Sequence, residues 1–251
     1  MAQRLGGAVK ANDISDTLTI RIASVNGNPP QNAQFQITAD SNNTPYVIEN
    51  GVLKGFNKLF SGSQIRALVI PNGVTSIGTG AFYNNQLTSV TIPNGVTTIG
   101  DQAFNANQLT SVVIPNSVTT IGVQAFFLNQ LTSVTIPNGV TTIGDQAFSS
   151  NRLTSVTIPK GVTTIGNQAF LSNQLTSVVI PNSVTSIGEN AFIFNFSLSS
   201  ITIGANVNLS PDISSPSFPY GGFDSFYNNN GKKAGKYTYN ENSKTWSYSA
   251  R

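Results

Sequence analysis

Residues 87–108 read LTSVTIPNGVTTIGDQAFNANQ, and close copies of this stretch begin at Leu109, Leu131, Leu153 and Leu175. The chain is therefore a tandem array with a period of 22 residues. One unit is too short to bury its own apolar face, so the copies must stack and cover one another in a solenoid. Solenoids present a long continuous surface, which predicts a binding function.

The array covers residues 43–207 when the copies are aligned on their leading apolar residue. Its parts are a degenerate first coil (43–64), six full repeats (65–197) and a partial repeat (198–207). In the first coil, Val47 and Ile48 match the strand of later copies and Asn50-Gly51-Val52 matches the turn. Residues 1–42 and 208–251 do not follow the period, so we expect an N-terminal capping segment and a C-terminal capping hairpin.

Each unit predicts two short strands and no long helix. The run L-T-S-V-T-I is rich in β-branched residues, and Pro-Asn-Gly or Pro-Asn-Ser ends it with a turn. The following V-T-T-I-G directs its Val and Ile to the core and its two Thr residues to solvent. We therefore expect a mainly β coil with parallel ladders.

Three positions keep one residue type in successive copies. They are Phe82 through Phe192, Gly78 through Gly188 and Asn85 through Asn195, each at the repeat spacing. Stacked copies would align the phenylalanines in an aromatic spine. Glycine would supply a backbone conformation that side chains forbid, and asparagine would bond backbone groups left unpaired inside a coil.

The composition excludes several functional classes. Lys and Arg number 13 against 10 Asp and Glu, and only 9% of residues are charged, against about 25% in a typical globular protein. We expect no nucleic-acid partner, because the positive field is weak. The chain has no cysteine and no histidine, so the common zinc ligands, nucleophile pairings and general base are missing. We expect no enzyme activity, no metal and no cofactor.

The membrane signals are also absent from the sequence. No apolar run approaches the ~20 residues that span a bilayer, so we expect no membrane insertion. The start MAQRLGGAVK lacks the apolar stretch of a signal peptide, which leaves a cytoplasmic location open.

The unit L-x-x-V-x-I-P-x-x-V-x-x-I-G-x-x-A-F, which covers about residues 43–207, resembles the BspA-like leucine-rich repeat of bacteria. The tail, with Gly231-Lys232-Lys233-Ala234-Gly235 and Trp246, is similar to the C-terminal module of treponemal and related members. The resemblance implies a right-handed solenoid of short parallel strands. It also implies a cell-surface, secreted or periplasmic protein that acts in adhesion or host interaction, and it names no particular ligand.

In a leucine-rich repeat strand, the third and fifth residues face outward and form the concave sheet. Here that surface has no charge and no aromatic ring, so each residue offers little binding energy. The candidate contact residues are Val69, Ser89, Thr91, Val113, Thr135, Thr157 and Val179.

The copies differ chiefly at the residue that follows the glycine position and at the two residues that follow the phenylalanine position. Of the pairs after the phenylalanine, two are wholly apolar, which is unusual for a turn, and the first begins with an aromatic residue; all lie on one rim that leads into the concave strand. The candidate anchors are Tyr83, Phe127, Leu128, Ile193 and Phe194. The alternative is neutral drift, with Ile193 and Phe194 packed under the C-terminal cap.

Two further groups of residues have structural explanations. Asp101, Asp145 and Glu189 share one column, and at two coils apart they stand about 10 Å from one another, too far to share a metal ion. The tail alternates in K-Y-T-Y and T-W-S-Y, which predicts a hairpin whose aromatic residues cover the last coil. Its lysines and aromatic rings could alternatively bind a polyanionic glycan.

Together these features predict a non-catalytic protein-interaction or adhesion module whose partner is a host or bacterial surface protein. Two alternatives remain at this point: a carbohydrate-binding module that uses the C-terminal aromatic residues, and a structural protein that assembles through its neutral coils. The sequence leaves the oligomeric state open.

Overall fold

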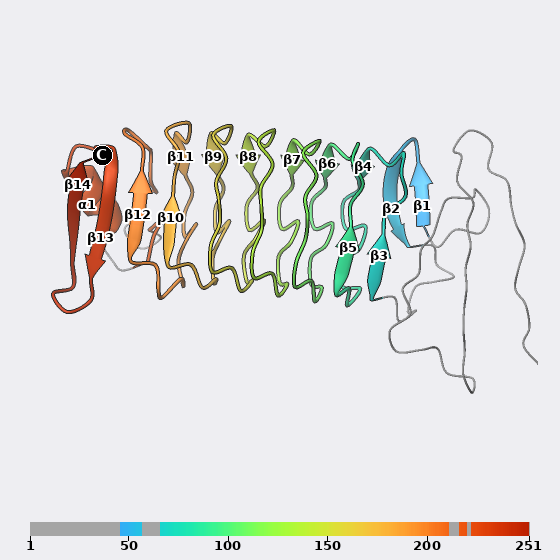
Figure 1. The fold of residues 1–251 in the computed structure, drawn as a ribbon, viewed down its shortest axis with the longest axis horizontal. Helices are drawn as coiled ribbons and strands as arrows, with labels where there is room; N and C mark the ends of the chain where they lie inside the picture. The colour runs from blue at the N-terminus through green and yellow to red at the C-terminus, as the bar shows by residue number, and fades with distance from the viewer. Residues whose placement is uncertain (1–45, 57–65, 211–215, 220–221, 251) are drawn as a thin grey trace, which may run out of the picture.

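The computed structural model describes residues 46–56, 66–210, 216–219 and 222–250. Figure 1 shows the coils side by side in one row, with β1 near one end and β14 at the other. The expected fold class, a mainly β leucine-rich-repeat solenoid, is confirmed, and the short α1 (Phe223–Asn229) is the only helix in the described residues. The expected N-terminal capping segment, residues 1–42, lies outside them.

Two ladders of short strands run along the row. The first strands are β3 (Ala67–Val69), β5 (Ser89–Thr91), β10 (Ser177–Val179) and β12 (Ser200–Ile203). Single parallel bridges at Val113, Thr135 and Thr157 continue this ladder through the middle coils. The second strands are β4 (Ser76–Ile77), β6 (Thr98–Ile99), β7 (Thr120–Ile121), β8 (Thr142–Ile143), β9 (Thr164–Ile165) and β11 (Ser186–Ile187). They pair in parallel, so their isoleucines form one buried row.

The recurring phenylalanines form the expected aromatic spine. All six, Phe82 through Phe192, are fully buried, and neighbouring ring centroids lie 5.3 to 5.7 Å apart with interplanar angles of at most 14°. Phe218 extends the stack at 4.9 Å from Phe192. Stacked pairs contribute about 0.5–1.5 kcal/mol each beyond the burial of their area, so the spine joins the repeats to the C-terminal segment.

The asparagine position also has the expected structural role. The Asn151 side chain is buried, and its Oδ1 accepts a hydrogen bond from the Leu131 N–H at 3.0 Å. Its Nδ2 donates to the carbonyl oxygens of Phe126 at 2.9 Å and Phe148 at 3.2 Å. One amide thus pairs backbone groups from two coils, and the other asparagines of this column that are buried repeat the pattern.

The expected reason for the glycine position is wrong. The six glycines from Gly78 to Gly188 all lack a positive φ. Glycine is needed instead because adjacent coils approach closely there. A Cβ at Gly144 would lie 2.7 Å from the carbonyl carbon of Gly122, and one at Gly100 would lie 2.8 Å from the Ile77 oxygen.

The first coil also differs from the expectation. Instead of a strand that continues the first ladder, Val47 and Ile48 lie in β1 (Tyr46–Glu49), which pairs antiparallel with β2 (Val52–Phe56). The reason is the turn: Asn50 and Gly51 both have positive φ, at 51° and 76°, as a two-residue hairpin loop requires. β2 then pairs in parallel with β4, with Leu53 opposite Ile77.

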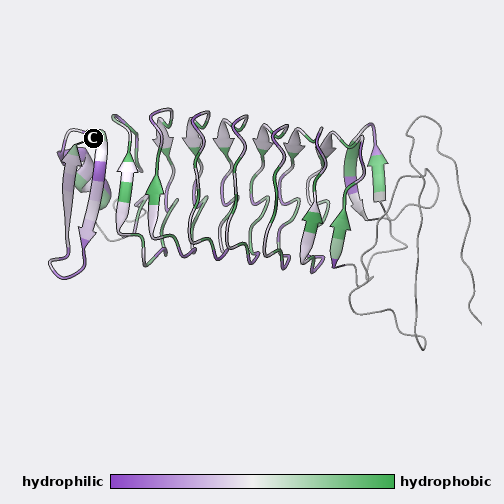
Figure 2. Cartoon of the chain, in the orientation of Figure 1, coloured by the Kyte–Doolittle hydropathy of each residue, from purple (hydrophilic) through white to green (hydrophobic). Residues whose placement is uncertain are grey.

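A hairpin stands at the C-terminal end of the row (Figure 1). Its strands β13 (Gly235–Asn240) and β14 (Thr245–Ala250) pair antiparallel, and β13 also pairs with β12, with Tyr237 opposite Ile201. In Figure 2 the hairpin loop is hydrophilic, whereas β10 and β12 beside it carry hydrophobic segments. The hairpin thus extends the first ladder at its apolar end.

The aromatic spine gives a stability prediction. Replacing Phe148 by Ala removes a fully buried ring between two stacked neighbours, so we expect a loss of about 3–5 kcal/mol in the free energy of unfolding, measured by denaturant titration. The exposed Thr157→Ala variant serves as a control and should change stability little. An unchanged midpoint in Phe148→Ala would contradict the stacked core.

Candidate interaction surface

The first-strand face is the outward surface of the first ladder, and its candidate residues are Val69, Ser89, Thr91, Val113, Thr135, Thr157 and Val179. The ladder brings them together, since each coil's fifth strand residue pairs with that of the next coil. All are exposed except Val69, which is partly buried. Val113 is the most prominent, with 81% of its surface exposed.

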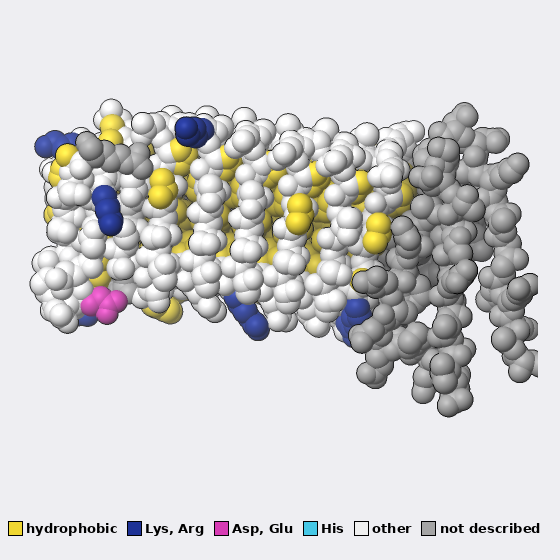
Figure 3. Space-filling model, viewed as in Figure 1, with side chains coloured by type: hydrophobic (Ala, Val, Ile, Leu, Met, Phe, Trp, Pro, Cys, Tyr) yellow, Lys and Arg dark blue, Asp and Glu magenta, His cyan; other side chains and the backbone are white. Residues whose placement is uncertain are grey.

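The first-strand face carries little charge. Figure 3 shows a mostly polar, uncharged surface in which hydrophobic atoms lie between the coils, while the few charged side chains lie mostly along the edges and at the hairpin end. A partner on this face would meet hydroxyl groups and methyl groups in a regular array. Long-range electrostatic attraction would be weak.

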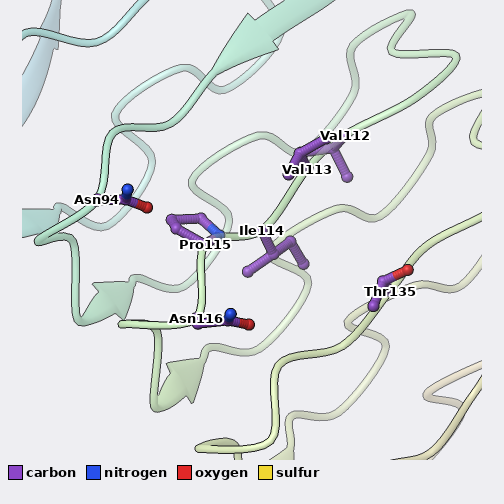
Figure 4. A pocket seen from close by; sticks show the side chains of 7 residues that line it. All are labelled: Asn94, Val112, Val113, Ile114, Pro115, Asn116 and Thr135. Carbon is purple, nitrogen blue, oxygen red and sulfur yellow. The ribbon is translucent and has the colours of Figure 1, made fainter.

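A hollow of about 380 Å³ opens beside Val113. Figure 4 shows Val113, Ile114 and Pro115 of one coil between Asn94 and Thr135 of the neighbouring coils. Its lining is apolar at the base and carries amides at the turn. The residues that line the hollow carry no ionisable group and offer methyl groups, two side-chain amides and a hydroxyl.

The rim consists of the residue pairs after each spine phenylalanine, and the structure separates the two members of each pair. The first members Phe127 and Ile193 are only partly exposed. The second members are more prominent, with Leu128 50% and Phe194 52% exposed. Tyr83, a first member at the N-terminal end, is half-exposed. The rim leads into the start of the first strand, whereas the hollow lies near its end.

The second rim position has an unusual backbone conformation. Its six residues all have left-handed φ between 55° and 60°: Asn84, Ala106, Leu128, Ser150, Ser172 and Phe194. This region costs a non-glycine residue roughly 1–2 kcal/mol, and Asn tolerates it best. A second left-handed column runs through Gln102, Gln124, Gln146 and Gln168, where amide side chains hydrogen-bond from coil to coil and offset the strain.

Sequence reasoning missed Phe196, the most exposed aromatic residue of the array among those whose side chains the structure describes. Phe196 is 71% exposed, and its ring centroid lies 5.8 Å from that of Phe194 at an interplanar angle of 45°. The available signal was the single residue inserted into the last full repeat. That insertion places a second phenylalanine where other copies pass directly from Asn-Gln into the first strand.

The carboxylates at one edge bond to the backbone. Oδ1 of Asp101 accepts from the Val123 N–H, and Oδ1 of Asp145 accepts from the Asn167 N–H, both at 2.8 Å. They thus satisfy the next coil's backbone. Among the described residues no cluster of three or more Asp, Glu, His or Cys side chains could hold a metal ion, and no helix there is long and apolar enough to cross a membrane.

The aromatic residues of the tail point mainly into the protein. Trp246 is only 8% exposed, and its ring packs against Phe223 at 4.9 Å and Tyr239 at 5.2 Å between centroids. The hydroxyl of Tyr227 donates to the Gly204 oxygen at 2.6 Å and accepts from the Val207 N–H. Little of the indole face is therefore available to stack on a sugar.

One buried carboxylate lies under the tail. Asp224 is buried, and its Oδ2 accepts a hydrogen bond from the Ser217 N–H at 2.7 Å while Oδ1 has no hydrogen-bond partner. Burial raises the pKa of this carboxyl above its ordinary value of 3.8, and the Ser217 hydrogen bond only partly opposes the effect.

These observations define a neutral, β-rich leucine-rich-repeat solenoid with an exposed face and an apolar rim. A model described as the BspA type leucine rich repeat region matches residues 54–171 and 97–221, in six copies. These matches span more than half of the chain, so the chain belongs to the BspA-type leucine-rich repeat family.

The solved structures that are similar to this chain include two bacterial leucine-rich repeat proteins. A leucine-rich cell surface protein from Faecalibacterium prausnitzii A2-165 is 31% identical with a TM-score of 0.54, and the similarity covers 82% of this chain and 51% of that protein. This chain thus spans about half of its length. A leucine-rich repeat protein from Bacteroides ovatus is 23% identical with a TM-score of 0.43, covering 68% and 58% of the two chains. No curated protein sequence matches the chain.

The position of Trp246 gives a prediction that separates a capping role from sugar binding. Because the ring is buried, Trp246→Ala should lower the free energy of unfolding by about 3–5 kcal/mol. Trp246→Phe should be tolerated better, since it keeps a ring and removes a buried indole N–H that has no partner. Normal stability of Trp246→Ala together with lost retention on an immobilised polysaccharide would identify a sugar platform instead.

Asp224 gives a prediction for pH dependence. Its pKa is higher in the folded than in the unfolded chain, so the folded state binds the proton more tightly and stability should fall as pH rises from about 3.8 through the raised value. Asp224→Asn should remove this component and be at least as stable as the parent near neutral pH. Unfolding curves of both proteins across this range are the measurement, and parallel pH profiles would contradict the assignment.

Proposed function

We propose that this chain is a non-catalytic protein-interaction module of a bacterial surface or secreted protein, and that it acts in adhesion to a host or bacterial surface protein. The observation that carries the proposal is the continuous row of exposed residues from Ser89 and Thr91 to Val179. The similar F. prausnitzii protein is described as a cell surface protein, which supports this location.

The chemistry of the surface favours a protein partner. Ser and Thr hydroxyls along the first-strand face can bond a partner's backbone, while Val113, Leu128 and Phe194 supply apolar contact area. Binding energy at protein interfaces is concentrated in a few large side chains. We therefore expect modest affinity that depends on the apolar residues and changes little with salt.

The carbohydrate alternative receives less support. The tail lysines Lys233, Lys236 and Lys244 are exposed, but Trp246 and Tyr237, the rings best suited to stacking on sugars, are buried. The hairpin packs against β12 and α1. The face and the rim therefore remain the preferred site.

Arginine substitutions on the two ladders test the proposal. The parent chain is first tested for binding to a panel of purified host extracellular and bacterial surface proteins. Thr135→Arg with Thr157→Arg places two bulky charges on the first-strand face. For a protein of the panel that binds the parent, we expect this variant to lose affinity at least tenfold. The matched control, Thr120→Arg with Thr142→Arg, adds the same charges to exposed residues of the second ladder and should leave affinity unchanged.

Two results would overturn this assignment. Equal losses in the two double variants would show that the first-strand face is not the site. Binding that is abolished by moderate salt would transfer the site to the basic tail and favour the glycan alternative.

A further inference from the structure

We infer that the rim carries two apolar anchors, Leu128 and the pair Phe194 and Phe196, which bind an extended apolar segment of a protein partner. The inference rests on the proposed protein-binding function and names the chemistry of the partner. The anchors are defined by three observations: backbone conformation, exposure and spacing.

Neither folding nor packing explains the residues at the two anchors. Leu128 has φ of 58° and Phe194 has φ of 60°, in the region that asparagine and glycine occupy most readily. The same column elsewhere carries small or polar residues: Asn84, Ala106, Ser150 and Ser172. About half of each anchor side chain is exposed, so its apolar surface is only partly used inside the protein. The left-handed conformation recurs in every coil, so the fold requires it, but the fold does not require a large apolar residue there. Residues that are costly in their backbone conformation and are kept without a packing need are typical of functional positions.

Each anchor follows a partly buried apolar residue in the chain. Beside Leu128 lies the partly buried Phe127, and beside Phe194 lies the partly buried Ile193. Phe196 widens the second anchor, since its ring contacts that of Phe194 and is 71% exposed. A partner side chain would therefore meet Leu128 at the first anchor and the rings of Phe194 and Phe196 at the second.

The spacing of the anchors selects an extended partner. Leu128 and Phe194 lie three coils apart, about 14 Å at ~4.8 Å per coil. The coils between them carry Ser150 and Ser172 at this position. These side chains are shorter and partly buried, so the anchor side chains project beyond them. In an extended chain, residues i and i+4 also stand about 14 Å apart on the same side. A segment with large apolar residues at that spacing would engage both anchors at once.

The polar groups near the first anchor are already paired, which disfavours a sugar or a nucleic acid. The Leu128 N–H donates to the Ser149 oxygen at 3.1 Å, and the Phe127 oxygen accepts from the Ala106 N–H at 2.9 Å. A sugar hydroxyl or a phosphate over Leu128 would lose water and gain no hydrogen bond from this side chain. An apolar side chain makes no hydrogen bonds to water, so its transfer from water to this surface has no such cost.

Asparagine substitutions separate binding from stability. Leu128→Asn with Phe194→Asn removes the first anchor and one of the two rings of the second, and places at each position a residue that accepts the left-handed conformation. The matched control, Ser150→Asn with Ser172→Asn, makes the same change at the two positions between the anchors, where φ is 55°. We expect both double variants to keep or raise the thermal unfolding midpoint of the parent.

The probe is a phage-displayed library of random peptides selected on the parent chain. We expect the selected peptides to carry large apolar residues four positions apart and to bind the Leu128→Asn, Phe194→Asn variant at least tenfold more weakly, while the Ser150→Asn, Ser172→Asn control binds them normally. Phe196→Ser should weaken binding by a smaller factor, because it removes only part of the second anchor.

Several results would overturn the inference. It fails if no peptide is selected, if the selected peptides are charged, or if they bind the anchor variant as well as the parent. It also fails if that variant unfolds at a lower temperature than the parent while peptides still bind, since the residues would then only pack the fold. Concentration-dependent dimerisation that the anchor variant abolishes would assign the anchors to a second copy of the chain. Loss of binding in the Thr135→Arg, Thr157→Arg variant but not in the anchor variant would leave the proposed function standing and reject the anchors alone.

Discussion

The side-chain amide of the buried asparagine is the interaction on which the solenoid depends. A coil of 22 residues turns tightly, and each turn leaves backbone N–H and C=O groups inside the protein without strand or helix partners. The amide carries two donors and an acceptor on one short side chain, so Asn129 pairs the Leu109 N–H below it and the carbonyl oxygens of Phe104 and Phe126. Buried polar groups left unpaired would cost about 1–3 kcal/mol each in every coil.

This pairing permits the rest of the coil to remain short. Once the asparagine satisfies the turn, the phenylalanine beside it can stay fully buried, and the glycine of the next segment can approach the preceding coil without a Cβ in the way. The result is a rod whose core is the same at every coil. Variation is therefore confined to positions that neither the core nor the backbone pairing constrains, chiefly the rim and the outward residues of the first ladder.

The same logic explains why function is expected on this surface. The scaffold stabilises itself coil by coil, and backbone hydrogen bonds between coils, such as that from the Leu128 N–H to the Ser149 oxygen, support the left-handed backbone at the rim. In the neighbouring glutamine column the strain is offset by a ladder of amide hydrogen bonds. The glutamine side chains thus serve the fold, whereas the large side chains of the rim column make no such ladder and are the ones we propose to contact a partner.

Much of this structure follows from the sequence by itself. The period, the two strands per coil, the aromatic spine and the role of the asparagine could be predicted because identical neighbours place each residue against its own copies. Tyr46–Glu49 could also have been assigned correctly, since Asn50-Gly51 between apolar runs is a strong hairpin signal that the repeat frame obscured.

Only the tertiary structure decided the remaining features. It showed that Gly144 is needed for close approach and not for an unusual φ, because distances between coils are not encoded in the spacing of residues. It showed Trp246 buried against Phe223, which depends on how the tail folds back on the last coil. It also separated Phe127, partly buried, from Leu128, exposed, because neighbouring residues of a turn point in different directions once the backbone adopts its left-handed conformation.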